Sequence, residues 1–161
     1  MQLDPTAQAF YEDLRRRYFP PARNLIAAHL TLFHQLPDDE PTHQTLRDAA
    51  QATQPFQLIN PTPRSIGKGA AIFFQSPPLM AIHASLSRAF EDQLIPQDRQ
   101  RLQPHIVIQN KVVPELARQT LPELQSISFP EPQAIGLSLF RYLGGPWQHL
   151  TDFPFHTSLP R

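Results

Sequence analysis

The sequence predicts a single α+β domain built from two similar units. The chain has 161 residues and no cysteine, and at this length a hydrophobic core can hold one domain together without disulfides. Its 19 prolines divide it into short segments, and these segments alternate between strand and helix patterns. A strand, a helix and a hairpin follow one another twice, at about residues 27–75 and again at 105–153. An internal repeat of this kind indicates a duplicated architecture.

An N-terminal helix and a first strand open the pattern. Thr6 can cap a helix that runs to about Tyr18, and Pro20-Pro21 ends it. Residues 27–34 are dense in apolar and β-branched side chains, which predicts a strand.

The rest of the first unit reads as a helix and a hairpin. Residues 42–52 are typical of a helix. The arms 56–66 and 70–75 flank a Gly-Lys-Gly turn, which predicts a hairpin. Two prolines confine its first arm to an edge or a bulge, because proline cannot donate to a ladder. A second long helix is expected over about 79–94.

The second unit follows a polar loop at 95–104 and has the same order. Residues 105–113 predict a strand, and 114–124 predict a helix with proline at its first position. Residues 134–142 and 147–153 flank a Gly-Gly-Pro turn, which predicts another hairpin.

Each unit begins with the same short pattern of histidine, apolar, small β-branched and apolar residues. The two copies are His29-Leu30-Thr31-Leu32 and His105-Ile106-Val107-Ile108. Alternate side chains of a strand share a face. His29 and Thr31 therefore point together away from the core.

Two such strands related by an approximate twofold would bring both imidazoles to one cleft. A pair of that kind is suited to in-line attack at phosphorus, because a neutral imidazole takes a proton from water while an imidazolium gives one to the departing oxygen. The hydroxyl of Thr31 would hold a nonbridging phosphoryl oxygen.

Together with residues 104–111 and 137–147, these motifs resemble the two-histidine (2H) phosphoesterase superfamily, in its branch named for 2′-5′ RNA ligase. The resemblance covers nearly the whole chain as one domain, 1–161. It implies two pseudo-symmetric lobes, each an antiparallel sheet with flanking helices, that face a central cleft. It also implies that His29 and His105 are catalytic, and that they cleave or form a phosphodiester at a nucleotide 2′ position. The usual reaction opens a 2′,3′-cyclic phosphate of a nucleotide or RNA end, without a metal or other cofactor.

One position departs from the family pattern. Val107 stands where the family has Thr or Ser, so one expected hydroxyl to the phosphate is missing. The protein could be a slow enzyme, could use Lys111 or Tyr142 as the substitute donor, or could have kept the cleft as a nucleotide or RNA-end binding protein. A third reading is a duplicated interaction module whose paired histidines are incidental.

Other polar and aromatic residues have competing interpretations. Lys111 shares the face of His105 if the alternation continues, and it could neutralise phosphate charge. Arg23 is a candidate for a phosphate-facing rim, whereas Arg15 and Arg16 are expected on a solvated helix face.

Aromatic residues near the last hairpin could stack on a base or simply pack; they are Tyr142 and Trp147. The remaining histidines are expected at the surface or hydrogen-bonded; they are His34, His43, His83, His149 and His156. No metal site is expected, since no pair of histidines has ligand spacing with an acidic partner.

Neither charge nor hydropathy points to a long polymer or a membrane. Lys+Arg and Asp+Glu both number 14, and a sequence-independent grip on long nucleic acid needs clustered cations. The start of the chain shows no basic region followed by an apolar one, and its longest nearly apolar run, 25–33, is too short to span a bilayer. We therefore expect a cytoplasmic monomer.

Overall fold

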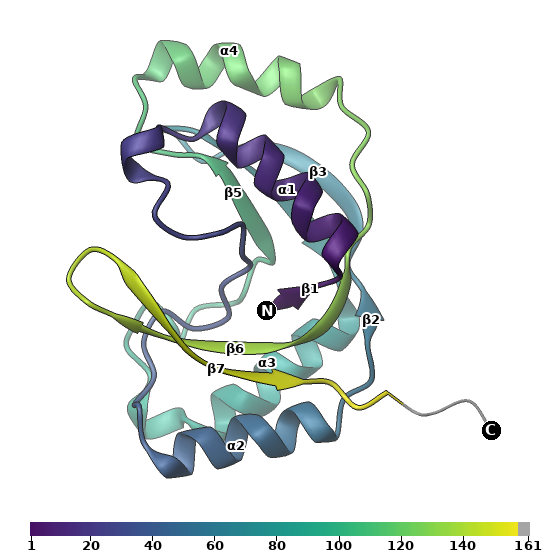
Figure 1. Cartoon of the computed structure of the whole chain (residues 1–161), viewed down its shortest axis with the longest axis vertical. Helices are drawn as coiled ribbons and strands as arrows, with labels where there is room; N and C mark the ends of the chain where they lie inside the picture. The colour runs from purple at the N-terminus through teal and green to yellow at the C-terminus, as the bar shows by residue number, and fades with distance from the viewer. Residues whose placement is uncertain (158–161) are drawn as a thin grey trace.

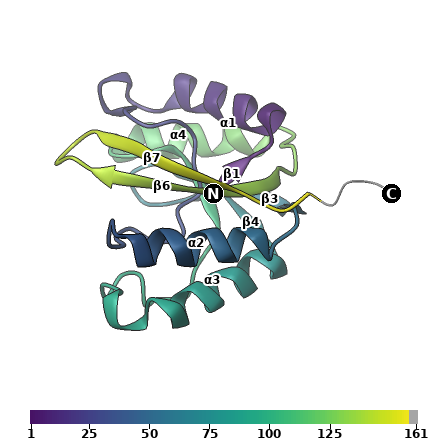
Figure 2. The ribbon, with the colours of Figure 1, turned by 60° about the horizontal axis from the view of Figure 1, so that its bottom comes forward.

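The structure is a computed structural model that describes residues 1–157, and it consists of two antiparallel sheets with helices on their outer faces. Figure 1 shows α1 and α4 beside the sheet of β3, β4 and β5, with α2 and α3 at the opposite end of the molecule beyond β6 and β7. The same layering is visible from a second direction in Figure 2. The α+β class expected from the sequence is confirmed. No helix in this part of the chain is long and apolar enough to cross a membrane.

Short polar side chains determine where three of the helices begin. The bounds are α1, Pro5–Tyr18; α2, Glu40–Gln51; α3, Pro77–Ala89; and α4, Pro114–Gln125, with short 3₁₀ turns at Pro21–Arg23 and Glu91–Gln93. Asp39 and Ser76 cap α2 and α3. The prediction that Thr6 caps the first helix is wrong. The side chain of Asp4 accepts the Ala7 N–H, which leaves a proline at the first helical position, where its missing N–H costs nothing.

The first sheet has the order β3-β4-β5. Its strands are β3, Ile59–Ser65; β4, Ala70–Gln75; and β5, His105–Gln109. The predicted hairpin is confirmed for β3 and β4, but the expected first arm, 56–66, is divided, because Phe56–Gln57 pairs in the other sheet. β3 lies at the edge of this sheet, as its prolines require.

The second sheet is built around the long strand β6. Its strands are β1, Gln2–Leu3; β2, Phe56–Gln57; β6, Gln133–Tyr142; and β7, Trp147–Pro154. The predicted hairpin of β6 and β7 is confirmed. The two sequence units are interleaved in space, because β5 from the second unit pairs with β4 from the first, and β2 from the first pairs with β6 from the second.

The strand predicted for residues 27–34 does not form. Only Leu30 pairs, in an isolated antiparallel bridge to Ile106. Side chains occupy the backbone donors that a ladder would use: Glu12 accepts the Ala28 N–H at 2.6 Å, and the carboxylate of Asp98 accepts the N–H of His34 at 2.9 Å.

The strand predicted for 105–113 is shorter than expected, since β5 ends at Gln109. Asn110 accepts the N–H of Lys111 through its side chain at 2.8 Å, and Lys111 has a φ of 59°. That left-handed conformation breaks the alternation of a strand, so the expectation that Lys111 shares the face of His105 is wrong.

One row of buried side chains joins the motifs to the core. Leu30 bridges to Ile106, and Ile106 pairs with Ile72 of β4. All three are at most 1% exposed. Because alternate residues point to opposite faces, this row directs the histidines that precede Leu30 and Ile106 to the other face of the sheet.

Candidate active site

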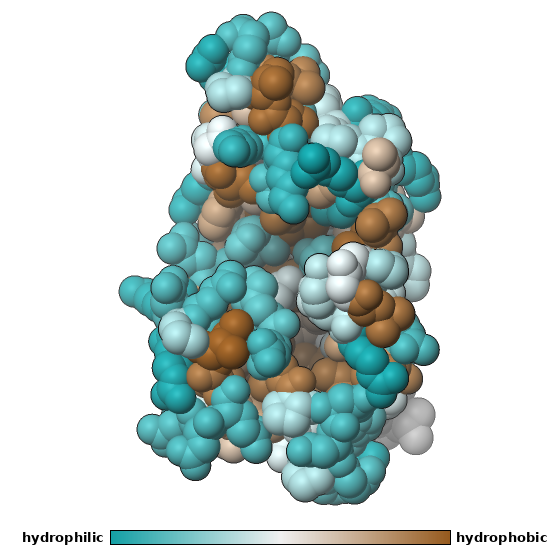
Figure 3. All heavy atoms as spheres, turned by 90° about the vertical axis from the view of Figure 1, so that its left-hand side faces the viewer, coloured by the Kyte–Doolittle hydropathy of each residue, from teal (hydrophilic) through white to brown (hydrophobic). Residues whose placement is uncertain are grey.

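A cavity of about 650 Å³ lies between the two sheets and receives both motifs. His29, Thr31, His105 and Val107 all line it. Much of the remaining wall is apolar, and it includes side chains of the opposite sheet such as Phe140 of β6. Figure 3 shows the corresponding side of the molecule, where hydrophobic residues are visible in the hollow between polar rims. The sequence motifs therefore meet in one place.

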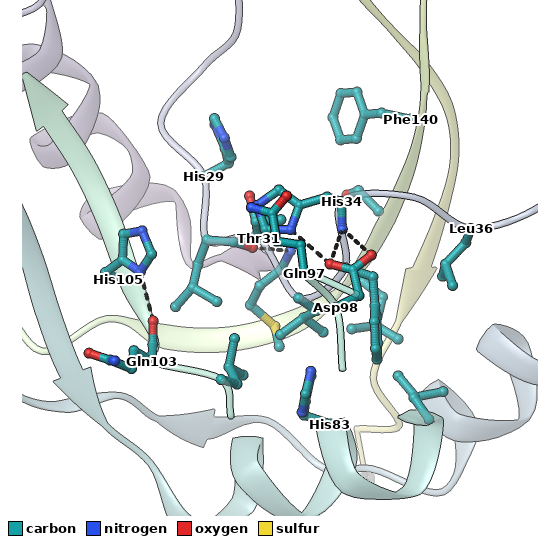
Figure 4. A pocket seen from close by; sticks show the side chains of 18 of the residues that line it. His29, Thr31, His34, Leu36, His83, Gln97, Asp98, Gln103, His105 and Phe140 are labelled. Carbon is teal, nitrogen blue, oxygen red and sulfur yellow. Dashed lines mark hydrogen bonds and ion pairs between the residues drawn. The ribbon is translucent and has the colours of Figure 1, made fainter. Parts of the chain in front are cut away.

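The bridge between Leu30 and Ile106 arranges the motifs crosswise. In an antiparallel pairing centred there, His29 lies across from Val107, and Thr31 lies across from His105. The two histidines are then diagonal neighbours, which in a regular ladder lie about 7 to 8 Å apart. Figure 4 shows His29 and His105 on adjacent segments beside Thr31. The two rings therefore enter the same cavity from neighbouring segments.

Both rings are anchored in the same way. Nδ1 of His29 donates to the carbonyl oxygen of Ala27 at 2.7 Å, and Nδ1 of His105 donates to the carbonyl oxygen of Gln103 at 2.7 Å. A carbonyl oxygen only accepts, so Nδ1 carries the proton in each ring and Nε2 is the nitrogen that changes protonation. Within residues 1–157 no side chain or backbone group hydrogen-bonds either Nε2. The two nitrogens are therefore available for proton transfer.

Electrostatics favours the neutral form of His29. Burial lowers the pKa of His29 below its ordinary 6.5, and the nearby charges of Arg15 and His105 lower it further, against the opposing hydrogen bond to Ala27. A neutral imidazole with a free Nε2 can accept a proton.

Arg15 is buried, contrary to the expectation that it lies on a solvated helix face. Its side chain is 2% exposed and donates to the carbonyl oxygens of Val107 at 2.7 Å and Ile26 at 3.2 Å. Two further bonds reach the side chain of Asn24. Arg15 thus ties α1 to the backbone that precedes the first motif and to the strand that carries the second.

Asp98 is a second buried charge that the sequence did not mark as functional. Its side chain is 1% exposed. The carboxylate accepts the backbone N–H groups of His34 and Gln35 and Nδ1–H of His34 at 2.8 Å. Nε2 of His34 lies 3.2 Å from the amide nitrogen of Gln97. His34, Asp98 and Gln97 form part of the cavity wall (Figure 4).

Three other residues predicted to contact phosphate or substrate lie outside the set that lines this cavity. Lys111 is exposed beyond the end of β5, and Arg23 is exposed on the 3₁₀ turn after α1. Tyr142 is 58% exposed, and its ring packs against Trp147, with centroids 4.8 Å apart. Of this pair, Trp147 is the one that reaches the cavity.

Arg101 is the cation that sequence reasoning missed. It is the one Arg or Lys among the described residues that line the cavity. It is exposed, and no described residue forms an ion pair or hydrogen bond with it. It precedes the second motif by four positions in a loop, so strand alternation gives no signal for it.

Of the remaining histidines, His156 is exposed and the other three have partners. His83 is buried and stacks on Phe33, with ring centroids 4.7 Å apart. His43 and His149 pair with Asp38 and Asp152. In the described part of the chain, no group of three or more histidine, aspartate or glutamate side chains is placed to hold a metal ion.

Two facing antiparallel sheets, with a pair of similarly anchored histidines in the cavity between them, define a two-histidine phosphoesterase fold. A comparison with protein-family models agrees: the model described as 2′-5′ RNA ligase superfamily matches residues 3–146. The chain belongs to this superfamily. A search of the curated proteins gave no match.

Solved structures show the same fold at low sequence identity. The crystal structure of TT0787 of Thermus thermophilus has a TM-score of 0.59 at 16% identity, covering 95% of this chain and 93% of that one. The crystal structure of Escherichia coli LigT complexed with 3′-AMP has a TM-score of 0.56 at 15% identity, covering 98% of this chain and 95% of that one.

Proposed function

We propose that this protein is a metal-independent phosphodiesterase that opens 2′,3′-cyclic phosphates, or cleaves 2′-5′ phosphodiesters, in nucleotides or at RNA ends. The observation that carries the proposal is the matched anchoring of His29 and His105 in one cavity. Membership of the 2′-5′ RNA ligase superfamily and the nucleotide bound in the structure of LigT both support a nucleotide substrate.

The roles follow from the protonation that each ring must have. Burial and neighbouring charges lower the pKa of His29, so His29 is the base that takes a proton from the attacking water. His105 is then the acid that protonates the departing ribose oxygen as its bond to phosphorus breaks. The water oxygen forms the new bond to phosphorus, and the Thr31 hydroxyl donates to a nonbridging oxygen. Each proton transfer contributes about 10² to 10⁴ in rate.

The cavity has room for more than the phosphoryl group. Its volume of about 650 Å³ and its largely apolar wall suit a nucleoside, since small-molecule sites combine apolar walls with a few polar groups. Arg101 adds a positive charge where this wall meets the neighbouring surface.

The test is turnover of a 2′,3′-cyclic nucleotide in the presence of a chelator. We expect His29→Ala and His105→Ala each to lower kcat by about 10² or more. His156→Ala is the matched control, because His156 is exposed and lies outside the cavity lining. Turnover that survives in either cavity variant would contradict the proposal.

Val107 supports a second candidate, a nucleotide or RNA-end binding protein without turnover. Position 107 lies across from His29. A hydroxyl there would contact the phosphate, and valine has none. Binding of a cyclic nucleotide with no turnover in the wild type, and turnover in Val107→Thr, would favour this candidate over the enzyme.

A further inference from the structure

A second hollow, of about 440 Å³, opens beside the catalytic cavity. The two share part of their walls: Phe73, Arg101, Leu102 and Gln103 line both. The second hollow then extends over β3 and β4 to Arg64 and Thr62. We call it the β3–β4 groove, and it leads directly away from the second motif.

The sheet register shows that the groove continues the surface that carries His105. Thr62 pairs with Phe73, and Phe73 pairs with His105. Residues paired across a sheet point to the same face. The side chain of Thr62 is therefore on the cavity side of the sheet, two strands away from the catalytic ring.

A stack of rings links the groove to the active site. The guanidinium of Arg64 lies 5.1 Å from the ring centroid of Phe73, and that ring stacks on His105 with centroids 5.0 Å apart. Cation–π contact holds the guanidinium plane and leaves its N–H groups free to donate at the edge.

The charge of the groove is unbalanced. Arg64 and Arg101 line it, no aspartate or glutamate is among its described lining residues, and neither arginine forms an ion pair or hydrogen bond with another described residue. Over the whole chain the formal net charge is zero. Two arginines without acidic partners, close to the proposed phosphoryl site, can bind one further phosphate. A long duplex would need a wider basic surface.

We propose that the β3–β4 groove binds the penultimate phosphodiester of a single RNA strand through Arg64 and Arg101, so that the preferred substrate is an oligonucleotide end and not a mononucleotide. The inference rests on the proposed function, because it places the terminal cyclic phosphate between His29 and His105. It adds a second phosphate site and the class of substrate that such a site selects.

The experiment compares uridine 2′,3′-cyclic phosphate with an RNA trinucleotide that ends in the same cyclic phosphate. We expect the wild type to have a kcat/KM about tenfold or more higher for the trinucleotide, and Arg64→Gln with Arg101→Gln to bring the ratio close to one. The logarithmic salt dependence for the trinucleotide should become shallower by about 0.7 for each arginine removed. Arg88→Gln is the matched control, because Arg88 is exposed on α3 and lines neither hollow.

Binding separates the two proposals. A labelled trinucleotide with a 3′-phosphate, followed by fluorescence anisotropy, reports the groove without turnover. Binding that depends on both arginines, with no turnover of either substrate, would support the phosphate site in the groove and contradict the proposed phosphodiesterase activity. Turnover of both substrates with equal kcat/KM, and a salt dependence unchanged in the double variant, would contradict the proposed phosphate site in the groove. The proposed phosphodiesterase activity would stand.

Discussion

Val107 puts a methyl group where the second motif of the superfamily has a hydroxyl, and it lies across from His29 in the cavity wall. Valine and threonine have nearly the same outline, so the substitution Val107→Thr adds a donor without changing the packing volume. Since loss of one oxyanion donor costs about 10² to 10³ in rate, we expect the variant to raise kcat for a 2′,3′-cyclic nucleotide by about tenfold or more. Steady-state kinetics measures this. An unchanged kcat would show that the missing hydroxyl does not limit the reaction.

Arg15 stabilises the backbone around the candidate active site, although its side chain does not line the cavity. Its guanidinium joins the backbone at Ile26 and Val107, so replacing it leaves buried carbonyl oxygens without donors. We expect Arg15→Met to lower the free energy of unfolding by about 2 to 4 kcal/mol, because hydrogen bonds from charged groups are worth about 1.5 to 3 kcal/mol each. Arg16→Met, at an exposed position on the same helix, should change it by less than about 0.5 kcal/mol.

Urea denaturation measures both variants. Equal stability of Arg15→Met and Arg16→Met would contradict the role assigned to Arg15. The sequence could not reveal this role, because Arg15 is one of three consecutive arginines, and such a run is ordinarily a solvated helix face. Only the packing of α1 against β5 distinguishes the buried member.

At the level of elements, the turn between β3 and β4 fixes the position of β5. A Cβ at Gly69 would lie 1.9 Å from the carbonyl oxygen of Gln109, which is the last residue of the strand that carries His105. Gly69→Ala therefore requires the backbone of β4 or β5 to move. We expect a loss of stability of about 1 to 3 kcal/mol, as for other overpacked positions, and a lower kcat.

Gly145→Ala, in the turn between β6 and β7, is the matched control for Gly69→Ala, because a Cβ at Gly145 meets nothing within 4 Å. Thermal unfolding and turnover of a cyclic nucleotide test the pair. If Gly69→Ala keeps the stability and the kcat of the wild type, the close approach to Gln109 does not fix the site.

The elements that the sequence predicted correctly are those with strong local signals. Both hairpins and all four helices form near the glycine or proline turns and helical patterns that predict them. The helix expected over 79–94 is shorter than predicted, since α3 ends at Ala89 and a 3₁₀ turn follows at Glu91–Gln93. The strand expected at 27–34 fails, because its backbone donors are used by Glu12 and Asp98, which are remote in sequence. The motif still points its histidine into the cavity, since the single bridge at Leu30 supplies the required orientation.

For the whole molecule, the meeting of His29 and His105 in one cavity could be predicted from the sequence, and the charges around them could not. His29 and His105 occupy equivalent places in a repeat, and a repeat can be recognised from the sequence alone. Arg101 and Asp98 reach the cavity from a loop with no periodic pattern. Their positions depend on how the two sheets close over each other, which no local rule encodes.

The cavity between the sheets also makes stability depend on pH in a specific window. Burial is the main cause that lowers the pKa of both His29 and His83 below 6.5. The unfolded chain therefore binds protons at these positions at a higher pH than the folded protein does. By linkage, the free energy of unfolding falls as pH drops below about 6.5, by less than about 1.4 kcal/mol per pH unit for each histidine.

Carboxylates contribute with the same sign but in a lower window. Contacts with partners such as His43 and Arg141 lower the pKa of Asp38, and hydrogen bonds from Thr42 lower that of Asp39, so the stability they provide is lost only as pH falls towards and below 3.8.

Between pH 7 and pH 5 we therefore expect the free energy of unfolding to decline, and the two histidines contribute to that decline. Urea denaturation at pH 7, 6 and 5 measures it, with His29→Gln and His83→Gln each expected to flatten the decline. The exposed His156 offers the control, because its replacement by Gln should leave the slope unchanged. A wild-type stability that is constant or rises over this range would mean that both rings titrate in the folded protein as they do in the unfolded chain, and that the cavity does not exclude water from them.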